Sequence, residues 1–117
     1  MYTVLVADDD AAILNSVRIY LKNEGYNVLT ATNGREVLDL VKTNEVHCLV
    51  LDIMMPEMDG LTATLNLRKE YNFPIIMLSA KSEDTDKIAG LSFGADDYVT
   101  KPFNPLELMA RVKSQIR

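Results

Sequence analysis

Residues 49–60 read Leu-Val-Leu-Asp-Ile-Met-Met-Pro-Glu-Met-Asp-Gly. The apolar run that leads into Asp52 is typical of a buried strand, and the segment from Pro56 to Gly60 is typical of a turn. A carboxylate at the point where a buried strand emerges is costly unless a cation or a hydrogen-bond donor pairs with it. The sequence therefore predicts that other parts of the chain supply partners for Asp52.

The composition describes one ordinary globular domain. Its 117 residues suffice for a single core and are too few for two. Apolar residues make up 48% and charged residues 25%, which is typical of a soluble chain. The formal net charge of −5 argues against direct binding of this segment to nucleic acid, and it suits a domain that gathers acids around a cation.

The sequence also indicates a compartment. No apolar run is long enough to span a bilayer, and the N-terminus has no basic region followed by an apolar segment. The only cysteine, Cys48, lies inside an apolar run, and a lone buried thiol suits a reducing environment. We therefore expect a cytoplasmic protein. The single histidine, His47, opens a strand, and we interpret it as structural.

Apolar runs of strand length alternate with stretches of roughly helical periodicity along the whole chain. Strands are expected at 3–7, 26–31, 46–51, 74–78 and 97–100. Helices are expected at 11–22, from 33–34 to 41, 60–70, 83–93 and 105–116. Strands buried on both faces and separated by helices predict an α/β fold with a doubly wound parallel sheet.

Ligands of open parallel sheets bind beyond the carboxyl ends of the strands, so the residues at those ends are the candidates for function. They are Asp8-Asp9, Asp52, Ser79 and Lys101. The strand at 26–31 ends without a comparable group. Four of the five strand ends are thus predicted to bring acids, one hydroxyl and one ammonium to a single patch.

This patch has the chemistry of a phosphoryl acceptor site. Carboxylates close together repel one another unless a cation joins them, and few hard oxygen ligands suit Mg²⁺. Asp9 and Asp52 would bind the ion directly, Asp8 through water, and a backbone carbonyl after Asp52 would add an oxygen. Asp52 would accept the phosphoryl group, Lys101 would hold one of its oxygens, and the Ser79 hydroxyl would donate to another.

A simpler interpretation exists for part of the acidic run. Asp-Asp-Asp before a helix is also typical of a helix N-cap with acids favoured by the helix dipole. We assign Asp10 to that role. Asp8 and Asp9 taken alone fit either a cap or a metal site, and their joint placement with Asp52 and Lys101 favours the metal site.

These residues resemble the receiver domain of two-component response regulators over the whole chain. The resemblance rests on Asp8-Asp9, on the 51–60 segment, on Ser79-Ala80, and on Gly-Ala-Asp-Asp-Tyr-Val-Thr-Lys-Pro-Phe at 94–103. It implies a flavodoxin-like (βα)5 fold with strand order 2-1-3-4-5. It also implies that the domain is not an enzyme for external substrates but catalyses only its own phosphorylation and dephosphorylation.

The resemblance assigns a role to each residue of the patch. Asp52 would accept a phosphoryl group from a histidine kinase, and Asp8, Asp9 and the carbonyl of Met54 would complete the Mg²⁺ site. Ser79 and Tyr98 would be the switch pair, and Lys101 would contact the phosphoryl group. The Lys101-Pro102 bond would be cis. Positions 54 and 81 vary in the family, and we expect the bulky Met54 to hinder hydrolysis and prolong the phosphorylated state.

The charges near the C-terminus are similar to those of the OmpR/PhoB class. In that class Lys87 would pair with Glu107 of a second subunit and Asp97 with Arg111, which predicts a phosphorylation-dependent two-fold dimer. Glu107 and Arg111 are spaced i, i+4, so a pair within one helix is the simpler alternative. The class also implies a DNA-binding output domain after residue 117, although a stand-alone receiver that acts by protein contacts remains the alternative.

Two other classes explain the sequence less well. A haloacid-dehalogenase-type phosphatase needs a second aspartate two residues after the first, and Met54 occupies that position. A flavodoxin-like cofactor binder needs a phosphate loop rich in glycine and hydroxyls after the first strand. The aspartates at 8–10 would instead repel a phosphate.

Overall fold

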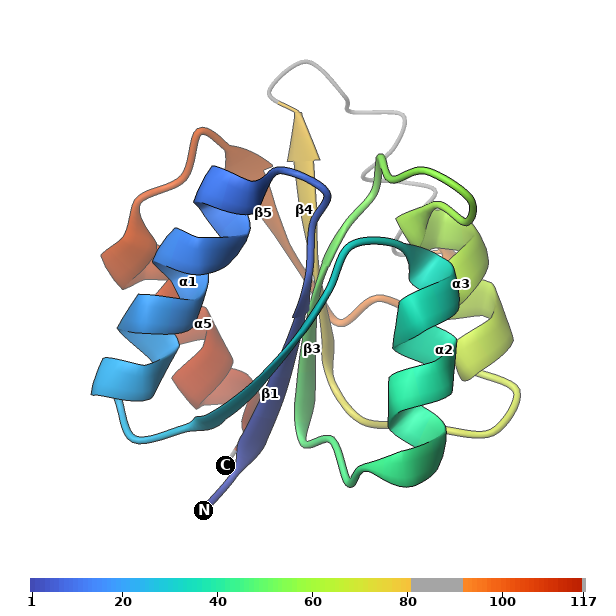
Figure 1. The fold of residues 1–117 in the computed structure, drawn as a ribbon, viewed down its shortest axis with the longest axis horizontal. Coiled ribbons are helices and arrows are strands. Elements are labelled where there is room, and N and C mark those ends of the chain that lie inside the picture. The colour runs from blue at the N-terminus through green and yellow to red at the C-terminus, as the bar shows by residue number, and fades with distance from the viewer. Residues whose placement is uncertain (81–91, 117) are drawn as a thin grey trace.

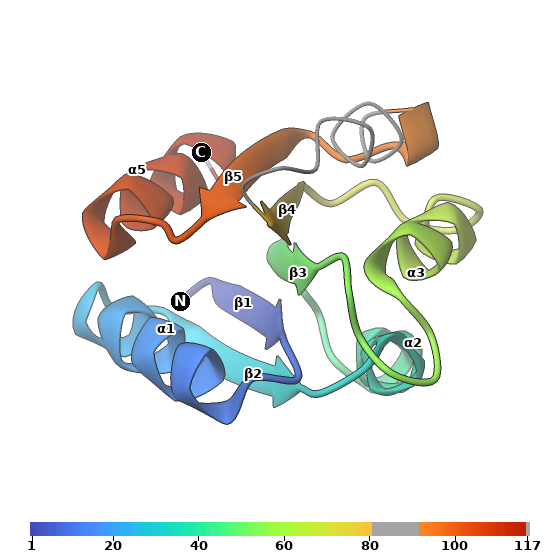
Figure 2. The ribbon, with the colours of Figure 1, turned by 90° about the horizontal axis from the view of Figure 1, so that it is seen from above.

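The computed structural model describes residues 1–80 and 92–116. Within this part of the chain, the strands form one parallel sheet in the predicted order β2-β1-β3-β4-β5. The strands are β1 (Thr3–Ala7), β2 (Asn27–Ala31), β3 (Cys48–Asp52), β4 (Ile75–Ala80) and β5 (Asp97–Lys101). Figure 2 shows the strands nearly end-on, with helices on both sides of the sheet.

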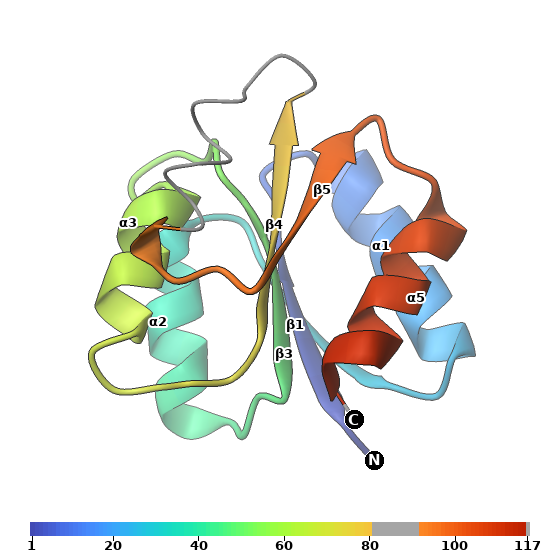
Figure 3. The same ribbon diagram turned by 180° about the vertical axis from the view of Figure 1, so that it is seen from behind.

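The helices are α1 (Ala11–Asn23), α2 (Gly34–Thr43), α3 (Gly60–Leu67) and α5 (Pro105–Ile116). Figure 1 shows α1 and α5 on one face of the sheet and α2 and α3 on the other, which is the doubly wound arrangement that the sequence predicts. From behind, β5 lies at the edge of the sheet nearest to α5 (Figure 3). Residues 83–91 of the helix predicted at 83–93 lie outside the described residues.

The central strands are apolar throughout because both faces of the sheet are covered. Alternate residues point to opposite faces: Leu5 and Leu49 join the core beneath α2 and α3, while Val6 and Val50 join the core beneath α1 and α5. All four are fully buried. This burial fixes the strand register, since a slip by one residue would exchange the two faces.

Several predicted boundaries are wrong by one to three residues; the fourth strand, for example, ends at Ala80 and not at residue 78. The third strand begins at Cys48 and includes Asp52, because the backbone ladder with β4 continues to Leu78, whose carbonyl also accepts from the Ile53 N–H (3.1 Å). The third helix ends at Leu67 and not at residue 70, because the N–H groups of Lys69 and Glu70 donate only three residues back, to the carbonyls of Asn66 (3.3 Å) and Leu67 (3.0 Å). Asp52 is therefore held by the sheet itself and is not a loop residue.

His47 has a structural role, as expected. Its Nδ1 accepts a hydrogen bond from the Thr3 N–H (3.0 Å), and its ring meets Tyr2 edge-on with 5.1 Å between centroids. These contacts lie at the amino-terminal edge of the sheet, away from the carboxyl ends. Among the described residues, no helix is long and apolar enough to cross a membrane.

Cys48 is expected to be inert in the folded protein. Burial, and secondarily the negative charge of Asp96, raise the pKa of its thiol to about 12. At pH 8 its thiolate fraction is then roughly a thousandfold lower than that of an exposed cysteine. A disulfide reagent added to the native protein should therefore react far more slowly than in urea, and the rate should rise with pH. Equal rates in both conditions would contradict this prediction.

Candidate functional site

The carboxyl ends of β1, β3 and β5 bring three charged side chains to one edge of the sheet. Asp8 follows β1 directly, while Asp52 and Lys101 are the last residues of β3 and β5. Because the strands are parallel, these ends share an edge, which lies at the top of the view in Figure 1. The sequence-predicted patch is therefore assembled.

The three acids of the patch, which we call the acid cluster, are Asp8, Asp9 and Asp52. Each offers a carboxylate oxygen, and these oxygens lie within 4.8 Å of one another. Asp8 is fully buried and Asp52 is 5% exposed, while Asp9 is exposed to solvent. A donor set made only of charged oxygens fits a hard divalent cation such as Mg²⁺ and disfavours softer metals.

Lys101 is the cation of the site. Its Nζ lies 3.0 Å from Oδ2 of Asp8 and 3.3 Å from Oδ2 of Asp52. To reach them from β5, the side chain crosses the end of β4, where its register partner is the small residue Ala80. The ammonium group thus faces a pocket of about 470 Å³ that the acid cluster, Asp10, Met54 and Ala80 also line.

The electrostatics of Asp52 reflect this crowding. Burial, and then the charge of Asp8, raise its pKa to about 6, while Lys101 and a hydrogen bond from the backbone of Met54 act in the opposite direction. Burial alone would lower the pKa of Lys101, but its hydrogen bond to Asp8 and the nearby carboxylates outweigh this and raise it. At neutral pH Asp52 is therefore ionised although its burial and the charge of Asp8 disfavour the ionised form. Lys101 is protonated.

Asp52→Asn is expected to stabilise the metal-free protein at pH 7.5 by about 2 kcal/mol, because it removes a buried charge next to Asp8. The folded-state pKa of Asp52 is raised above its usual 3.8, so its destabilising effect is complete above pH 6 and absent below pH 4. The difference in unfolding free energy between variant and wild type should therefore shrink as the pH falls. Urea unfolding at several pH values measures it.

The exposed Asp39→Asn is the matched control, and it should change stability little at any pH. A lower stability of Asp52→Asn at pH 7.5, or a difference that does not depend on pH, would contradict the account of Asp52.

The backbone around Asp8 holds it in place. Its Oδ1 accepts from the Asp10 N–H (2.9 Å), and its own N–H donates to the Ala31 carbonyl (3.1 Å). Asp10 caps α1, as predicted: its Oδ1 accepts from the N–H groups of Ala12 (2.9 Å) and Ile13 (3.3 Å). The three aspartates of the run therefore have different roles: Asp10 caps α1, while Asp8 and Asp9 belong to the acid cluster.

Ser79 and Tyr98 lie on the neighbouring strands β4 and β5. Ser79 is buried, and its Oγ has no hydrogen-bond partner within residues 1–80 and 92–116. It follows Leu78, which is the register partner of Asp52. Tyr98 is half-buried and packs against the core beneath α2 and α3. Ser79 is therefore a buried hydroxyl one position beyond the register partner of Asp52. The Lys101-Pro102 peptide bond is cis, as predicted.

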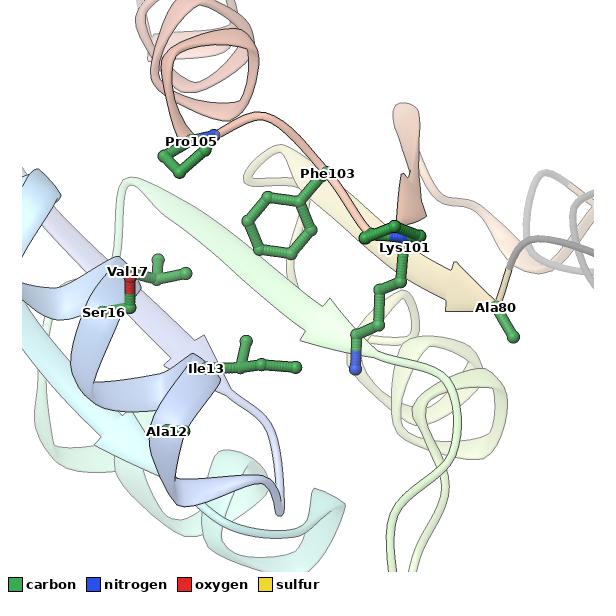
Figure 4. Close-up of a pocket in the computed structure, with 9 residues that line it drawn as sticks. Ala12, Ile13, Ser16, Val17, Ala80, Lys101, Phe103 and Pro105 are labelled. Atoms are coloured by element: carbon green, nitrogen blue, oxygen red, sulfur yellow. The ribbon is translucent and has the colours of Figure 1, made fainter.

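An apolar groove of about 500 Å³ adjoins the site, and Figure 4 shows it between α1 and the segment after β5. Lys101 extends along it, between Phe103 and Ala80, so that the groove opens toward the acid cluster. Its other lining residues are Ala12, Ile13, Ser16, Val17, Pro102 and Pro105. A macromolecule seated in this groove would place its own groups next to Lys101.

The charges predicted for a dimer face pair within one chain in this structure. Nη1 of Arg111 lies 2.8 Å from Oδ1 and 3.0 Å from Oδ2 of Asp97, and Nε lies 3.5 Å from Oε1 of Glu107. The simpler alternative of an intrahelical Glu107–Arg111 pair is thus present. Lys87 lies outside the described residues, and the predicted pairs between subunits stay predictions.

Sequence reasoning missed one residue with many contacts, Arg68. It follows α3, and its guanidinium donates to the carbonyls of Gly94 (2.9 Å) and Phe73 (2.7 Å) and to Asp96 (2.7 Å). The sequence did hold one indication of these contacts. Arg68 lies four residues after the buried Thr64, so it continues the buried face of α3. A charged residue on such a face needs partners.

Comparison with known proteins agrees with this geometry. Residues 4–113 match the family described as response regulator receiver domain. The chain is 47% identical over 114 residues to the regulatory protein VanR of Enterococcus faecium, with 97% of this chain and 49% of VanR covered. It is 43% identical over 115 residues to the response regulator GtcR of Aneurinibacillus migulanus, with 98% and 48% covered.

A solved structure is also similar. The receiver domain of the Francisella response regulator 1452 has 41% identity and a TM-score of 0.93, with 99% of this chain and 97% of that chain covered. The chain therefore aligns with nearly all of an isolated receiver domain, whereas it spans about half the length of the curated relatives it matches.

Proposed function

The chain belongs to the response regulator receiver domain family of two-component signalling proteins, and from this premise we propose that Asp52 accepts a phosphoryl group from a sensor histidine kinase. The observation that carries the proposal is the position of Asp52. It is a buried carboxylate at a strand end, 3.3 Å from the ammonium of Lys101 and grouped with Asp8 and Asp9.

The transfer is a nucleophilic displacement at phosphorus. One oxygen of the ionised Asp52 attacks, an O–P bond forms, and the P–N bond to the donor imidazole breaks as its nitrogen takes up a proton from solvent. Since the pKa of Asp52 is about 6, most of the carboxyl groups are ionised at neutral pH and available for attack. Lys101 neutralises a phosphoryl oxygen, and the buried Ser79 hydroxyl donates to another.

Asp8, Asp9 and Asp52, with the carbonyl of Met54, would hold Mg²⁺. Bound there, the ion would neutralise charge on the carboxylates and on the phosphoryl oxygens. The chain's own contribution is to hold these oxygens together at one strand edge, which the hydrogen bonds to Asp8 and the β3 ladder do.

We further propose that the domain catalyses only its own phosphorylation and dephosphorylation. A phosphatase of the haloacid-dehalogenase type would need a second aspartate two residues after Asp52, and that position is Met54. The apolar groove beside Lys101 gives the kinase a surface on which to dock, so that its phosphohistidine reaches Asp52.

Met54→Asn is expected to shorten the lifetime of the phosphorylated domain several-fold. Met54 is 68% exposed and lines the pocket of the acid cluster, so its long apolar side chain would obstruct an attacking water. The decay of phosphorylated protein after removal of the donor measures the effect. Leu65→Asn, which changes an exposed apolar residue on α3, should leave the lifetime unchanged. An unchanged lifetime in Met54→Asn would disprove the role.

For the output we propose a cytoplasmic transcription regulator of the OmpR/PhoB class. The acyl phosphate would attract Ser79, Tyr98 would turn inward, and the surface of β5 and α5 would then favour a two-fold dimer. Pairing of Asp97 and Arg111 between subunits would replace the contact that they make within one chain. The curated relatives are about twice as long as this chain, which supports a further domain over a stand-alone receiver, and we propose that this domain binds DNA.

The test is incubation with Mg²⁺ and a small phosphodonor, followed by intact mass, peptide mapping and sedimentation. Wild type should gain one phosphoryl group on Asp52, and Asp52→Asn should gain none. Asp59→Asn, which changes an exposed aspartate of the same loop, should be labelled like wild type. Unlabelled wild type, or full labelling of Asp52→Asn, would overturn the proposal. If the phosphorylated protein stays monomeric, only the proposed dimer is overturned, and the assignment of Asp52 as phosphoryl acceptor stands.

A further inference from the structure

The end of β2 and the segment after it contribute no charged side chain to the acid cluster, but they contact Asp8 and the loop that follows Asp52. The carbonyl of Ala31 accepts from the Asp8 N–H (3.1 Å). Three residues later, the Gly34 N–H donates to the Met58 carbonyl (2.9 Å), and Asn33 Nδ2 donates to Oε2 of Glu57 (3.1 Å). Residues 31–34 thus connect the end of β1 to residues 53–60, which we call the acceptor loop.

Asn33 serves two elements with one side chain. Its Oδ1 accepts from the Glu36 N–H (2.9 Å) and caps α2, while its Nδ2 faces the acceptor loop. Asn33 is buried, although it is polar. Its partner Glu57 has a φ of 63°, a left-handed conformation that is unfavourable for a residue with a side chain. The contact with Asn33 helps to hold the loop in this conformation.

Gly34 allows the acceptor loop to come close. A Cβ at this position would lie 2.7 Å from the Met58 carbonyl oxygen and 2.9 Å from its Cγ. Any larger residue would therefore push the loop away from α2. At its other end the loop is closed by the Gly60 N–H, which donates to the Ile53 carbonyl (2.8 Å).

The position of the acceptor loop matters because the loop touches Asp52. The backbone of Met54 donates a hydrogen bond to the Asp52 carboxylate. Met54 also lines the pocket of the acid cluster. A shift of the loop would change both the surroundings of Asp52 and the distance of Met54 from Asp8 and Asp9.

We propose that Asn33 and Gly34 are positioning residues, which hold the acceptor loop where the acid cluster binds a divalent cation. This inference rests on the metal site of the proposed function and extends it to residues that contact no ligand. Supporting residues of metal sites typically change affinity about 10- to 100-fold when they are replaced.

Asn33→Ser separates the two roles of Asn33. Serine is an equally good N-cap, so α2 keeps its capping acceptor, but the donor to Glu57 is lost. We expect Mg²⁺ affinity, measured by calorimetry on the unphosphorylated protein, to fall about tenfold with little change in melting temperature. Gly34→Ala should weaken it at least as much, because it displaces the loop directly.

Gly25→Ala is the matched control for backbone strain. Gly25 has a φ of 91° and open space around its Cα, and it lies beyond the far end of α1 from the acid cluster. This variant should lose stability and keep wild-type Mg²⁺ affinity. Equal weakening in Gly25→Ala and Gly34→Ala would show a general effect of stability and overturn the inference, as would unchanged affinity in Asn33→Ser.

A double variant tests whether Asn33 acts through Glu57. In a Glu57→Ala background, Asn33→Ser should have no further effect on Mg²⁺ affinity, and full additivity would overturn that route. The two proposals fail in different ways. Failure of wild type to bind Mg²⁺ would overturn the metal site and this inference with it, whereas failure of Asp52 to accept a phosphoryl group would leave the affinity differences standing.

Discussion

Lys101→Met should slow phosphoryl incorporation at Asp52 at least about a hundredfold, the usual effect of removing one preorganised charge from a transition state. The ammonium is the only cationic group that the described residues place within ion-pair distance of Asp52. Methionine keeps the length and apolar stem of the side chain and removes only the charge. The rate with a small phosphodonor at saturating Mg²⁺ measures the effect without any contribution from kinase docking.

Below saturating Mg²⁺, where the proton and the metal ion compete for Asp52, the same variant should also change the pH dependence of labelling. Lys101 lowers the pKa of Asp52, so its removal allows burial and Asp8 to raise that pKa further above 6. A smaller fraction of Asp52 is then ionised at neutral pH, and part of the lost rate should return as the pH is raised toward 9. In wild type the rate should no longer change with pH in this range, because Asp52 is already ionised.

Two other lysine variants make this prediction specific. Lys101→Arg keeps the charge on a bulkier, planar group and should recover part of the rate. Lys113→Met, on the exposed side of α5, should react like wild type. A rate for Lys101→Met within threefold of wild type would show that the charge of Lys101 does not assist phosphoryl transfer.

The sequence predicted the parts of the site that follow from strand order. In a parallel sheet, residues at the carboxyl ends of strands meet whatever else the chain does, so Asp8, Asp52, Ser79 and Lys101 could be grouped from their positions alone. The N-cap role of Asp10 was equally local, because a cap is defined by the few residues that follow it.

Contacts between elements far apart in the chain were not predictable in this way. The hydrogen bond between Asn33 and Glu57 joins residues 24 positions apart, and it depends on how α2 packs beside the acceptor loop. The ion pair of Asp97 with Arg111 depends in the same way on where α5 settles against β5. The class resemblance had named Asp97 and Arg111 as partners between two subunits, whereas in this structure they pair within one chain.

Arg68 is the clearest example of such a contact, and Arg68→Met should cost about 3–4 kcal/mol of unfolding free energy. Its guanidinium joins the end of α3 to residues before β4 and before β5 through Phe73, Gly94 and Asp96. Oδ2 of Asp96 also accepts from the Ile75 N–H (2.8 Å), so this carboxylate ties the start of β4 into the same network. Methionine preserves the packed stem, removes the donor to the Phe73 and Gly94 carbonyls, and leaves Asp96 with the Ile75 N–H alone.

Urea unfolding compares Arg68→Met with Arg68→Lys and with Arg35→Met, which alters an exposed arginine of α2. Lysine restores the charge but has a single ammonium, which cannot reach acceptors in three directions as the planar guanidinium does. Arg68→Lys should therefore remain at least about 2 kcal/mol less stable than wild type, while Arg35→Met should stay within about 0.5 kcal/mol. Full recovery by lysine would show that charge alone matters, and a loss below 1 kcal/mol in Arg68→Met would show that water replaces the network. Because β5 carries Tyr98 and Lys101, a loosened Arg68 network should also slow phosphoryl incorporation, but less than the loss of Lys101 itself.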